Sequence, residues 1–523
     1  MRNRRSLHLL LLVFSLAAAL PSAIAQVVIA TIPVGNNPHS GAVNSVTNKV
    51  YVGNNCGVDP TCQSGSGTMT VIDGATLSTQ TVAVGDYPYS VAVNAVTNKA
   101  SVATCGNDPT CASNGTVAII DGVTLSTQNV NVGINPVFVA VNSVTNKIYA
   151  VNLSCSAFPC SSPGTVTAID GATLGTQTVI VGYDPHSLAI DSVTNNIYVI
   201  NECGEDVSCG SHGTVTVIDG VTLATQTVNV GFVPLFSAVN SVTDKIYVVN
   251  NGGSDGSGNG TVTVIDGSTL STQTVAVGIF PAPVAVNTTT NRVYVGNRCG
   301  SDPNCYNDPS ATVIDGNTLS TTTVSICSIE TYPDDVEVNS VTNHIYLPCS
   351  GRRRQGTTGR IVTDIDGATN NTTTPIAVGD FPAAALVNSV INTIYVPNAG
   401  DGTVSVIAGD TALQFVNVPP CRVVDTRNAN GTFGGPAIQG GTFRSFPIPQ
   451  GACNIPATAA AYSLNVTLVP DQGTPVGYLT IWPAGENQPV ASTTNSLDGR
   501  VKANAGIIPA GVTGGVSVFE ATG

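Results

Sequence analysis

Histidine has the widest chemical range of any residue in this chain, and it is scarce. Beyond residue 25 only His39, His186, His212 and His344 occur, and the sequence has no nucleophile elbow, phosphate-binding loop or HExxH motif. His39 and His186 follow a proline at equivalent places in two similar segments, and Asp334 stands at that place in a third. Two imidazoles and a carboxylate could hold a metal ion. The alternative is that all three are solvated polar residues at a rim.

A second set of segments carries acidic residues and one basic cluster. The acids recur in short stretches rich in Cys, Gly, Asp and Pro, whereas the run of three arginines replaces them in one stretch only. We take these charged residues as candidates for a binding face: Asp59, Asp108, Asp206, Asp302, Arg352, Arg353 and Arg354. Calcium binding is an alternative for the acids, but their spacing does not resemble an EF-hand.

Fourteen cysteines, all beyond residue 25, indicate an oxidising destination. Zinc sites usually combine C-x₂₋₄-C with a second pair or a histidine nearby, whereas the close pairs here are separated by four or five residues and lie far apart. We therefore predict disulfides, with the pair at 327 and 349 assigned by exclusion. The predicted pairs are Cys56–Cys62, Cys105–Cys111, Cys155–Cys160, Cys203–Cys209, Cys299–Cys305, Cys327–Cys349 and Cys421–Cys453.

The elements that position these residues are repeats of about 49 residues. Each copy has an apolar run ending in Asn or Asp, and these end residues are Asn44, Asn94, Asn142, Asp191, Asn240, Asn287, Asn339 and Asn388. In the copy at 137–182, strands are expected at 139–142, 148–151, 164–170 and 177–181. Asn146 is expected to accept a left-handed conformation in the first turn. Four short antiparallel strands per repeat of this length predict a propeller blade.

The repeat also carries a family resemblance. Val-Thr-Asn after a strand, followed by Lys-Ile-Tyr-Val and Gly-Thr-Val-Thr-Val-Ile-Asp, resembles the YVTN-repeat β-propellers of secreted and surface bacterial and archaeal proteins. The resemblance covers about residues 27–408, and Ser101 departs from it where the other copies carry Tyr. It implies a fold and carries little information about activity.

The strand count predicts how the ring closes. The first three strands of the repeat occur eight times but the fourth only seven times, and the segment 29–35 resembles the missing copy. We expect an all-β, eight-bladed propeller at 26–410 that the N-terminal strand closes, because closure removes exposed sheet edges.

A second module without the repeat is expected at 415–523, as a small β-sandwich. It resembles a β-rich module found at the C-terminus of large bacterial secreted proteins. In that module a further strand usually follows the counterpart of residues 516–520, so this strand is expected to have an unpaired edge here; the alternative is that the chain is a fragment.

The first 25 residues have the pattern of a secretory signal peptide. Arg2, Arg4 and Arg5 precede the apolar stretch 7–20, and small residues at 23–25 form a cleavage site. A retained membrane anchor is the alternative, although the apolar run is short for a membrane span. We expect a secreted or cell-surface protein, with the periplasm as an alternative. The net charge of −14 argues against nucleic acid as a partner.

These features favour a non-catalytic binding or surface-interaction protein. Disulfide-pinned loops on one face would form a pre-organised surface, although the same bonds could simply stabilise exposed loops. We expect a monomer without a cofactor, whose partner is an extracellular protein or a cell-envelope polysaccharide. The alternative is a propeller enzyme, either a lactonase-like hydrolase or a quinoprotein-like oxidoreductase, with a metal bound at the channel mouth by His39, His186 and Asp334.

Overall fold

A computed structural model describes most of the chain beyond residue 25. The described residues are 26–59, 61–62, 66–156, 160–252, 259–302, 309–327, 331–351, 359–409, 421–453, 455–456, 459, 461–470, 475–489 and 492–522. The predicted signal peptide, Cys305 and the arginines at 352–354 lie outside them. Among the described residues, no helix is long and apolar enough to cross a bilayer. The chain forms two compact units, 1–411 and 412–523.

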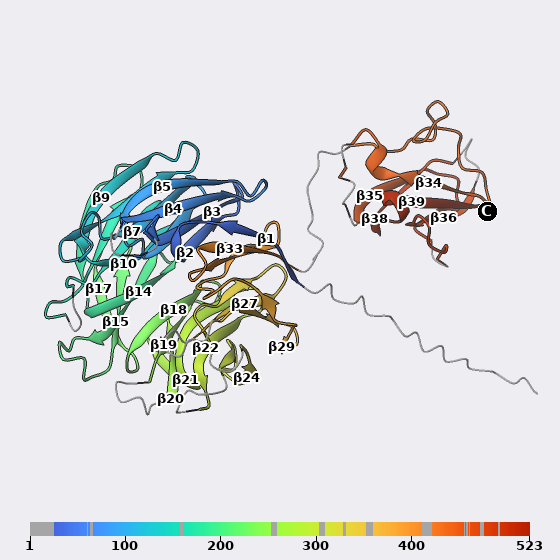
Figure 1. Ribbon diagram of the computed structural model, residues 1–523. Helices are drawn as coiled ribbons and strands as arrows, with labels where there is room; N and C mark the ends of the chain where they lie inside the picture. Colours follow the sequence, from blue (N-terminus) through green and yellow to red (C-terminus); the bar gives the residue numbers. More distant parts are fainter. Residues whose placement is uncertain are drawn as a thin grey trace, which may run out of the picture. The chain divides into compact units, whose positions relative to one another are not determined.

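The first unit consists of antiparallel sheets in which consecutive strands are neighbours (Figure 1). The first four sheets have four strands each. They comprise β2 (Asn36–Asn44), β3 (Lys49–Gly57), β4 (Ser66–Asp73) and β5 (Thr79–Asp86); β6 (Ser90–Asn94), β7 (Lys99–Thr104), β8 (Asn114–Asp121) and β9 (Thr127–Ile134); β10 (Pro136–Asn142), β11 (Lys147–Asn152), β12 (Thr165–Asp170) and β13 (Thr176–Ile180); and β14 (Tyr183–Asp191), β15 (Asn196–Gly204), β16 (Thr214–Asp219) and β17 (Thr225–Asn229).

Two larger sheets continue the series. The 16-residue strand β21 joins two four-stranded meanders into one seven-stranded sheet. Its strands are β18 (Pro234–Asn240), β19 (Lys245–Asn250), β20 (Asn259–Asp266), β21 (Thr272–Asn287), β22 (Arg292–Gly300), β23 (Ser310–Asp315) and β24 (Thr321–Ser325). The next sheet contains β25 (Thr331–Pro333), β26 (Glu337–Asn339), β27 (His344–Gly351), β28 (Ile361–Asp366), β29 (Asn371–Thr372) and β30 (Ile376–Ala377).

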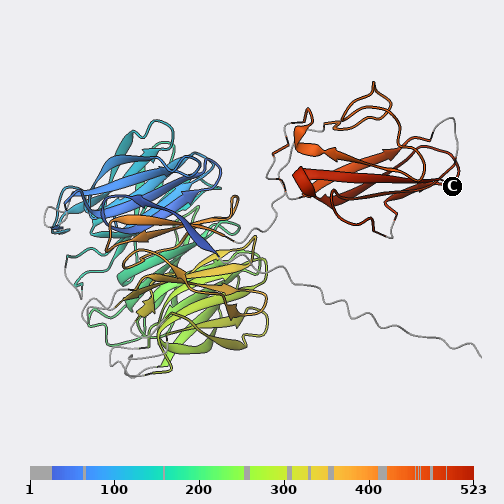
Figure 2. The ribbon, with the colours of Figure 1, turned by 45° about the vertical axis from the view of Figure 1, so that its right-hand side comes forward.

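The last sheet of this unit combines the two ends of the repeat region. Strands β31 (Leu386–Asn388), β32 (Thr393–Asn398) and β33 (Thr403–Ala408) are completed by β1 (Val27–Pro33), which pairs antiparallel with β33. In Figures 1 and 2 the dark-blue β1 lies beside the orange β33. The N-terminal strand therefore supplies the fourth strand of the final sheet.

Apolar clusters between neighbouring sheets form the core. One cluster joins Tyr149 of β11 to Leu188 and Val199 of the following sheet. Another joins Ile32 and Val404 of the last sheet to β3 of the first. The tyrosine of the second strand is fully buried in seven of the repeats, and these residues are Tyr51, Tyr149, Tyr198, Tyr247, Tyr294, Tyr346 and Tyr395.

Side-chain amides connect the turns of neighbouring sheets. Asn142, at the end of β10, accepts hydrogen bonds from the backbone N–H groups of Val144 and Thr145 at 3.0 and 3.3 Å, which fixes the turn after its own strand. Its Nδ2 donates to Asn195 Oδ1 of the next sheet at 2.8 Å. The left-handed turn predicted at Asn146 is confirmed by a φ of 54°.

The same amide bond recurs between successive repeats at 2.7–2.9 Å. The pairs are Asn44–Asn98, Asn94–Asn146, Asn142–Asn195, Asn240–Asn291, Asn287–Asn343, Asn339–Asn392 and Asn388–Asn48. The last pair joins the final sheet to the first. Between the fourth sheet and the next, Asp191 and Asp244 occupy these two positions.

The second unit has two antiparallel sheets that share one apolar cluster, which includes Phe446, Tyr462 and Ile481. One sheet has the order β34-β39-β36-β37, and β35 pairs with β38 in the other. Their bounds are β34 (Phe443–Pro447), β35 (Ala461–Leu468), β36 (Val476–Pro483), β37 (Thr494–Ser496), β38 (Lys502–Pro509) and β39 (Gly515–Thr522), with 3₁₀ turns at Ile448–Gln450 and Val512–Gly514. The expected unpaired edge at 516–520 is wrong, because β39 lies between β34 and β36 and is paired on both sides.

Deleting residues 26–33 should destabilise the first unit. The deletion exposes the edge of β33 and removes Ile32, which is only 5% exposed, from its cluster. Loss of one large buried side chain costs about 2–5 kcal/mol, so the thermal unfolding midpoint should fall clearly. Ile32→Ala should reproduce part of this loss, whereas Ile29→Ser, on the same strand but 59% exposed, should change little. A truncated protein that unfolds like the intact one would rule out this closure.

The contact between the fourth sheet and the next, where Asp191 faces Asp244, should make the stability of the first unit depend on pH. Burial first, and then the Asp191 charge, raise the pKa of Asp244. A raised carboxyl pKa stabilises the fold at acid pH, and this stabilisation is lost as the pH rises through the folded-state pKa. Asp191→Asn restores an amide donor, so its unfolding midpoint should exceed that of the unmodified protein by a few degrees at pH 8 and by less at pH 4. An equal difference at both pH values would contradict this assignment.

Candidate binding face

The loops after the second strand of each sheet lie beside the links between sheets. In the second sheet, Cys105 donates its backbone N–H to Asp86 O at 2.8 Å, and Asp86 donates to Gly106 O at 2.7 Å. Asp86 ends the last strand of the preceding sheet. Cysteine-containing loops and inter-sheet links therefore share one face of the unit, which we call the Cys-loop face.

The structure pairs the cysteines of four of these loops. Cα–Cα separations are 4.7 Å for Cys56–Cys62, 5.1 Å for Cys105–Cys111, 5.5 Å for Cys155–Cys160 and 4.3 Å for Cys203–Cys209. Cys299 is also disulfide-bonded, and its predicted partner Cys305 lies outside the described residues. The longer pairs are Cys327–Cys349 and Cys421–Cys453, at 5.5 and 5.7 Å. These bonds indicate an oxidising environment.

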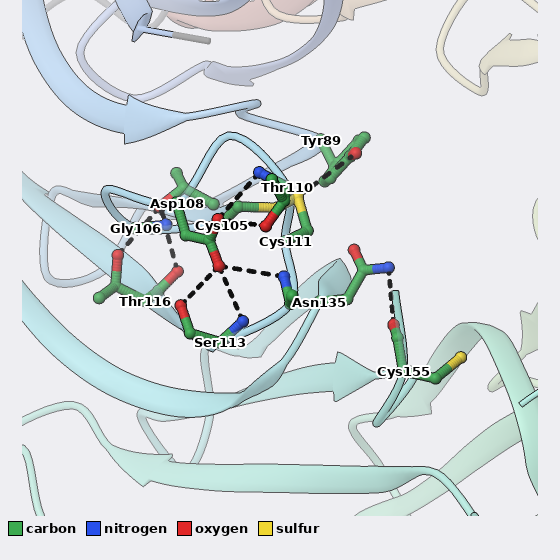
Figure 3. The surroundings of a disulfide bond; sticks show 12 residues. Tyr89, Cys105, Gly106, Asp108, Thr110, Cys111, Ser113, Thr116, Asn135 and Cys155 are labelled. Carbon is green, nitrogen blue, oxygen red and sulfur yellow. Dashed lines mark hydrogen bonds between the residues drawn. A yellow bond between two sulfur atoms is a disulfide. The ribbon is translucent and has the colours of Figure 1, made fainter. Parts of the chain in front are cut away.

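Asp108 organises the loop that the Cys105–Cys111 bond closes (Figure 3). One carboxylate oxygen accepts hydrogen bonds from the Thr110 N–H at 2.9 Å and the Thr110 hydroxyl at 2.5 Å. The other accepts from the Ser113 N–H at 2.8 Å, the Ser113 hydroxyl at 2.7 Å and the Ala112 N–H at 3.0 Å. The side-chain hydrogen bonds from Thr110 and Ser113 contribute most to holding the pKa of Asp108 far below its usual value.

The other acids predicted for this face have similar surroundings. Asp59 accepts from the N–H and hydroxyl of Thr61 at 2.8 and 2.7 Å, and Asp206 accepts from those of Ser208 at 2.9 and 2.6 Å. The backbone N–H of Asp302 donates to Cys299 O at 2.8 Å, as that of Asp59 does to Cys56 O. Asp59, Asp108 and Asp206 therefore shape their own loops, and a partner meets carboxylates that already accept several hydrogen bonds.

Asp184 is a buried acid that the sequence analysis did not single out. It is 3% exposed, and its Oδ2 accepts from the Cys160 N–H at 3.3 Å and lies 3.2 Å from Cys203 Sγ. It thus bridges the disulfides of two neighbouring loops. Both ligand-like clusters among the described residues combine Asp184 with cysteines of these disulfides, whose sulfurs are not thiolates and so are poor metal ligands. Burial, and then Asp184, raise the pKa of nearby Glu202 to about 7.

The residues proposed for a metal at the channel mouth have other neighbours. His39 is exposed, whereas His186 packs edge-on against Phe236 with ring centroids 5.4 Å apart, and burial lowers the pKa of His186. Asp334 lies 3.6 Å from the guanidinium of Arg298. The ligand clusters found among the described residues include none of the three.

Two further acids lie at β26: Glu337 is on the strand and Asp335 just precedes it. The sequence repeat marks Glu337 as unusual. Glu337 occupies a place that carries alanine in six other copies, such as Ala140 and Ala189. Asp335 Oδ2 accepts from the Ala385 N–H at 3.0 Å. Burial, and then the neighbouring Asp335, raise the pKa of Glu337 to about 8.

Aromatic side chains add an apolar component to the Cys-loop face. The rings of Tyr87 and Tyr89 stack with centroids 5.9 Å apart and an interplanar angle of 17°. Tyr89 is 36% exposed, and its hydroxyl lies 3.9 Å from Cys111 Sγ (Figure 3). The exposed rings of His212 and Phe232 lie 4.0 Å apart. Exposed rings beside hydrogen-bonding acids suit a ligand that presents both C–H faces and hydroxyl groups.

Comparisons with known proteins show a β-propeller fold. The Dos1 propeller has a TM-score of 0.55 and 10% identity, covering 73% of this chain and 95% of that chain. Sqt1 of Saccharomyces cerevisiae has a TM-score of 0.54 and 8% identity, covering 73% of this chain and 98% of that chain. No protein-family model and no curated protein match the sequence. The likeness therefore shows the fold alone.

Replacing Asp108 by alanine should loosen its loop while the disulfide remains. The backbone N–H groups of Thr110 and Ser113 lose their acceptors, so their hydrogen exchange should accelerate about tenfold or more as the loop opens locally. Exchange within β7 and β8 should be unchanged. Asp206→Ala should have the same effect at Ser208 and leave Thr110 protected. If exchange at Thr110 and Ser113 is unaffected, the disulfide alone holds the loop.

Proposed function

We propose that this chain is a secreted or surface-exposed, eight-bladed propeller of the YVTN-repeat type that acts as a non-catalytic binding protein. The blade count is supported by β1 as the fourth strand of the last sheet and by the Asn388–Asn48 bond at 2.8 Å. The family assignment rests on the repeated sequence, and the location rests on the disulfides and the N-terminal pattern.

The observation that carries the binding function is the construction of the Cys-loop face. Its short loops are fixed both by a disulfide and by an aspartate that accepts hydrogen bonds from within the loop, as at Cys105–Cys111 and Asp108. Such loops lose little conformational entropy when a partner binds. They also differ among the copies, whereas the residues that repeat identically serve packing between sheets.

A cell-envelope polysaccharide is the partner class that the exposed groups suit best. Sugars offer apolar C–H faces to rings such as the Tyr87–Tyr89 stack, and their hydroxyls can form hydrogen bonds with polar groups of the neighbouring loops. The arginines at 352–354 lie outside the described residues and would favour an anionic polysaccharide. No observation favours the enzyme alternative, because His39, His186 and Asp334 do not form a ligand cluster among the described residues.

Binding to insoluble cell-wall polysaccharide and to a glycan array should test this function. Protein beginning at Gln26 should bind, and Tyr87→Ala together with Tyr89→Ala should weaken binding about tenfold or more, because stacking on a ring contributes about 1–2 kcal/mol. Asp73→Asn, in a turn away from these loops, is the matched control. Unfolding midpoints of all variants should stay close together.

Two results would overturn the proposal. The first is binding that survives the tyrosine double variant but is lost in Tyr478→Ala, whose side chain is 38% exposed in the second unit; this would make the second unit the binder. The second is turnover of a substrate by the purified protein that depends on His39 or His186, which would establish the enzyme alternative.

A further inference from the structure

Long cationic side chains connect successive sheets on the face opposite the cysteine loops. Lys49 Nζ, at the start of β3, donates to Gly122 O in the turn between the third and fourth strands of the next sheet, at 2.5 Å. Lys147 does the same to Gly220 O at 2.6 Å. Arg292 donates to Gly367 O at 2.7 Å. The cation thus reaches the glycine carbonyl of an Asp-Gly turn on the neighbouring sheet.

The cation also lies between two carboxylates. Lys147 contributes to lowering the pKa of Asp170 in its own sheet and of Asp219 in the next, in addition to the larger effect of hydrogen bonds within each aspartate's own turn. The Gly220 carbonyl and the carboxylates of Asp170 and Asp219 therefore form a cation site between the two sheets, and the Lys147 side chain occupies it.

Three places that correspond to Lys147 carry neither lysine nor arginine, and one of these junctions has both aspartates; at the other two, which carry His344 and Thr393, Ala408 replaces one of the aspartates. At the start of β15 the corresponding residue is Asn196, whose short amide cannot extend as far as the four-carbon stem of lysine. A cavity of about 410 Å³ lies here, lined by Asn196, Val217, Asp219, Gly267, Thr269 and Leu270 among others. Asn196 and Gly267 are the counterparts of Lys147 and Gly220.

At the same junction, Asp191 and Asp244 replace the two asparagines whose side chains are hydrogen-bonded at the other junctions. Asp191 is fully buried, and no residue other than the facing aspartate donates to its Oδ2 or to Asp244 Oδ1; the interaction between the two carboxyl groups contributes to raising the pKa of Asp244. Asp244 also adjoins the cavity, because its carbonyl accepts from the Gly267 N–H at 2.8 Å. Two positive charges lie nearby among the described residues: Lys147 contributes to lowering the pKa of Asp219, and Lys245 pairs with Asp266 at 2.5 Å. This junction therefore lacks both cross-sheet donors and has an excess of negative charge.

We propose that this cavity binds a primary ammonium group on an unbranched alkyl chain, which takes the place that a lysine side chain occupies at three other junctions. The ammonium donates to Gly267 O and lies between the carboxylates of Asp219 and Asp266, and its alkyl chain packs against Val217 and Leu270. A calcium ion needs six to eight oxygen ligands, whereas an ammonium group needs only three acceptors. The ligand is either a free alkylamine or a lysine side chain of a partner protein.

Thermal unfolding of the protein beginning at Gln26 tests the site at pH 7.5, with n-butylammonium chloride against sodium chloride at equal ionic strength. A ligand that binds only the folded state raises the unfolding midpoint. We expect a saturable shift of about 2 °C at about 50 mM amine. n-Butyltrimethylammonium, which has no N–H donor, should give no shift beyond that of sodium chloride.

Asn196→Lys is the decisive variant, because it supplies the lysine found at the equivalent place in other sheets. It should unfold at a higher temperature than the unmodified protein and lose its response to butylammonium. Asp191→Asn, which restores an amide pair, should keep a reduced response. Comparing butylammonium with an Nα-acetyl-lysine amide distinguishes a free amine from a lysine side chain as the preferred ligand.

Equal shifts in the unmodified protein and in Asn196→Lys would overturn the proposal, since the amine would then act elsewhere. Stabilisation by calcium chloride, lost in Asp191→Asn and without any amine response, would replace it with a metal site. Because these measurements use no polysaccharide, their outcome is independent of the binding function proposed above.

Discussion

The structure of the first unit depends on a side-chain amide that makes hydrogen bonds in two directions. Asn142 is representative, because its oxygen caps the turn after its own strand and its nitrogen donates to Asn195 of the next sheet. A buried hydrogen bond of this kind contributes about 1 kcal/mol net, but its geometric effect is larger. It fixes the turn of one sheet relative to that of the next, and the tyrosines and valines then pack between sheets held at that spacing.

This requirement explains why asparagine recurs at both positions. The receiving residue has a positive φ, 53° at Asn98 and 54° at Asn146, and asparagine tolerates that conformation better than most residues. The adjoining Asp-Gly turn needs glycine, because a Cβ at Gly122 would collide with Asn98 Oδ1. Three features of the repeat that look separate in the sequence, the strand-ending Asn, the Val-Thr-Asn turn and the Asp-Gly turn, therefore meet in one contact.

Much of the fold could be predicted from the sequence, because each repeat encodes its own strands and turns locally. Periodicity indicated the strands, and the left-handed turn at Asn146 followed from the properties of asparagine. Contacts between repeats were harder to predict. Asp184 bridges two disulfides of different sheets, and no spacing within one repeat indicates that. The position of β39 was missed for a similar reason, since its neighbours β34 and β36 are distant in the sequence.

Departures from the repeat differ in whether the fold compensates for them. Asp364 is a fully buried acid among residues that are apolar in other copies, but His344 Nδ1 lies 2.9 Å from it and the Thr373 hydroxyl donates to it at 3.1 Å. That substitution is satisfied within its own sheet. Asp191 and Asp244 have no such compensation for their facing oxygens, and at the same junction Asn196 replaces the lysine that could have supplied a positive charge. An uncompensated buried charge is costly. The raised pKa of Asp244 offsets part of this cost, and a cation bound in the neighbouring cavity would offset more of it.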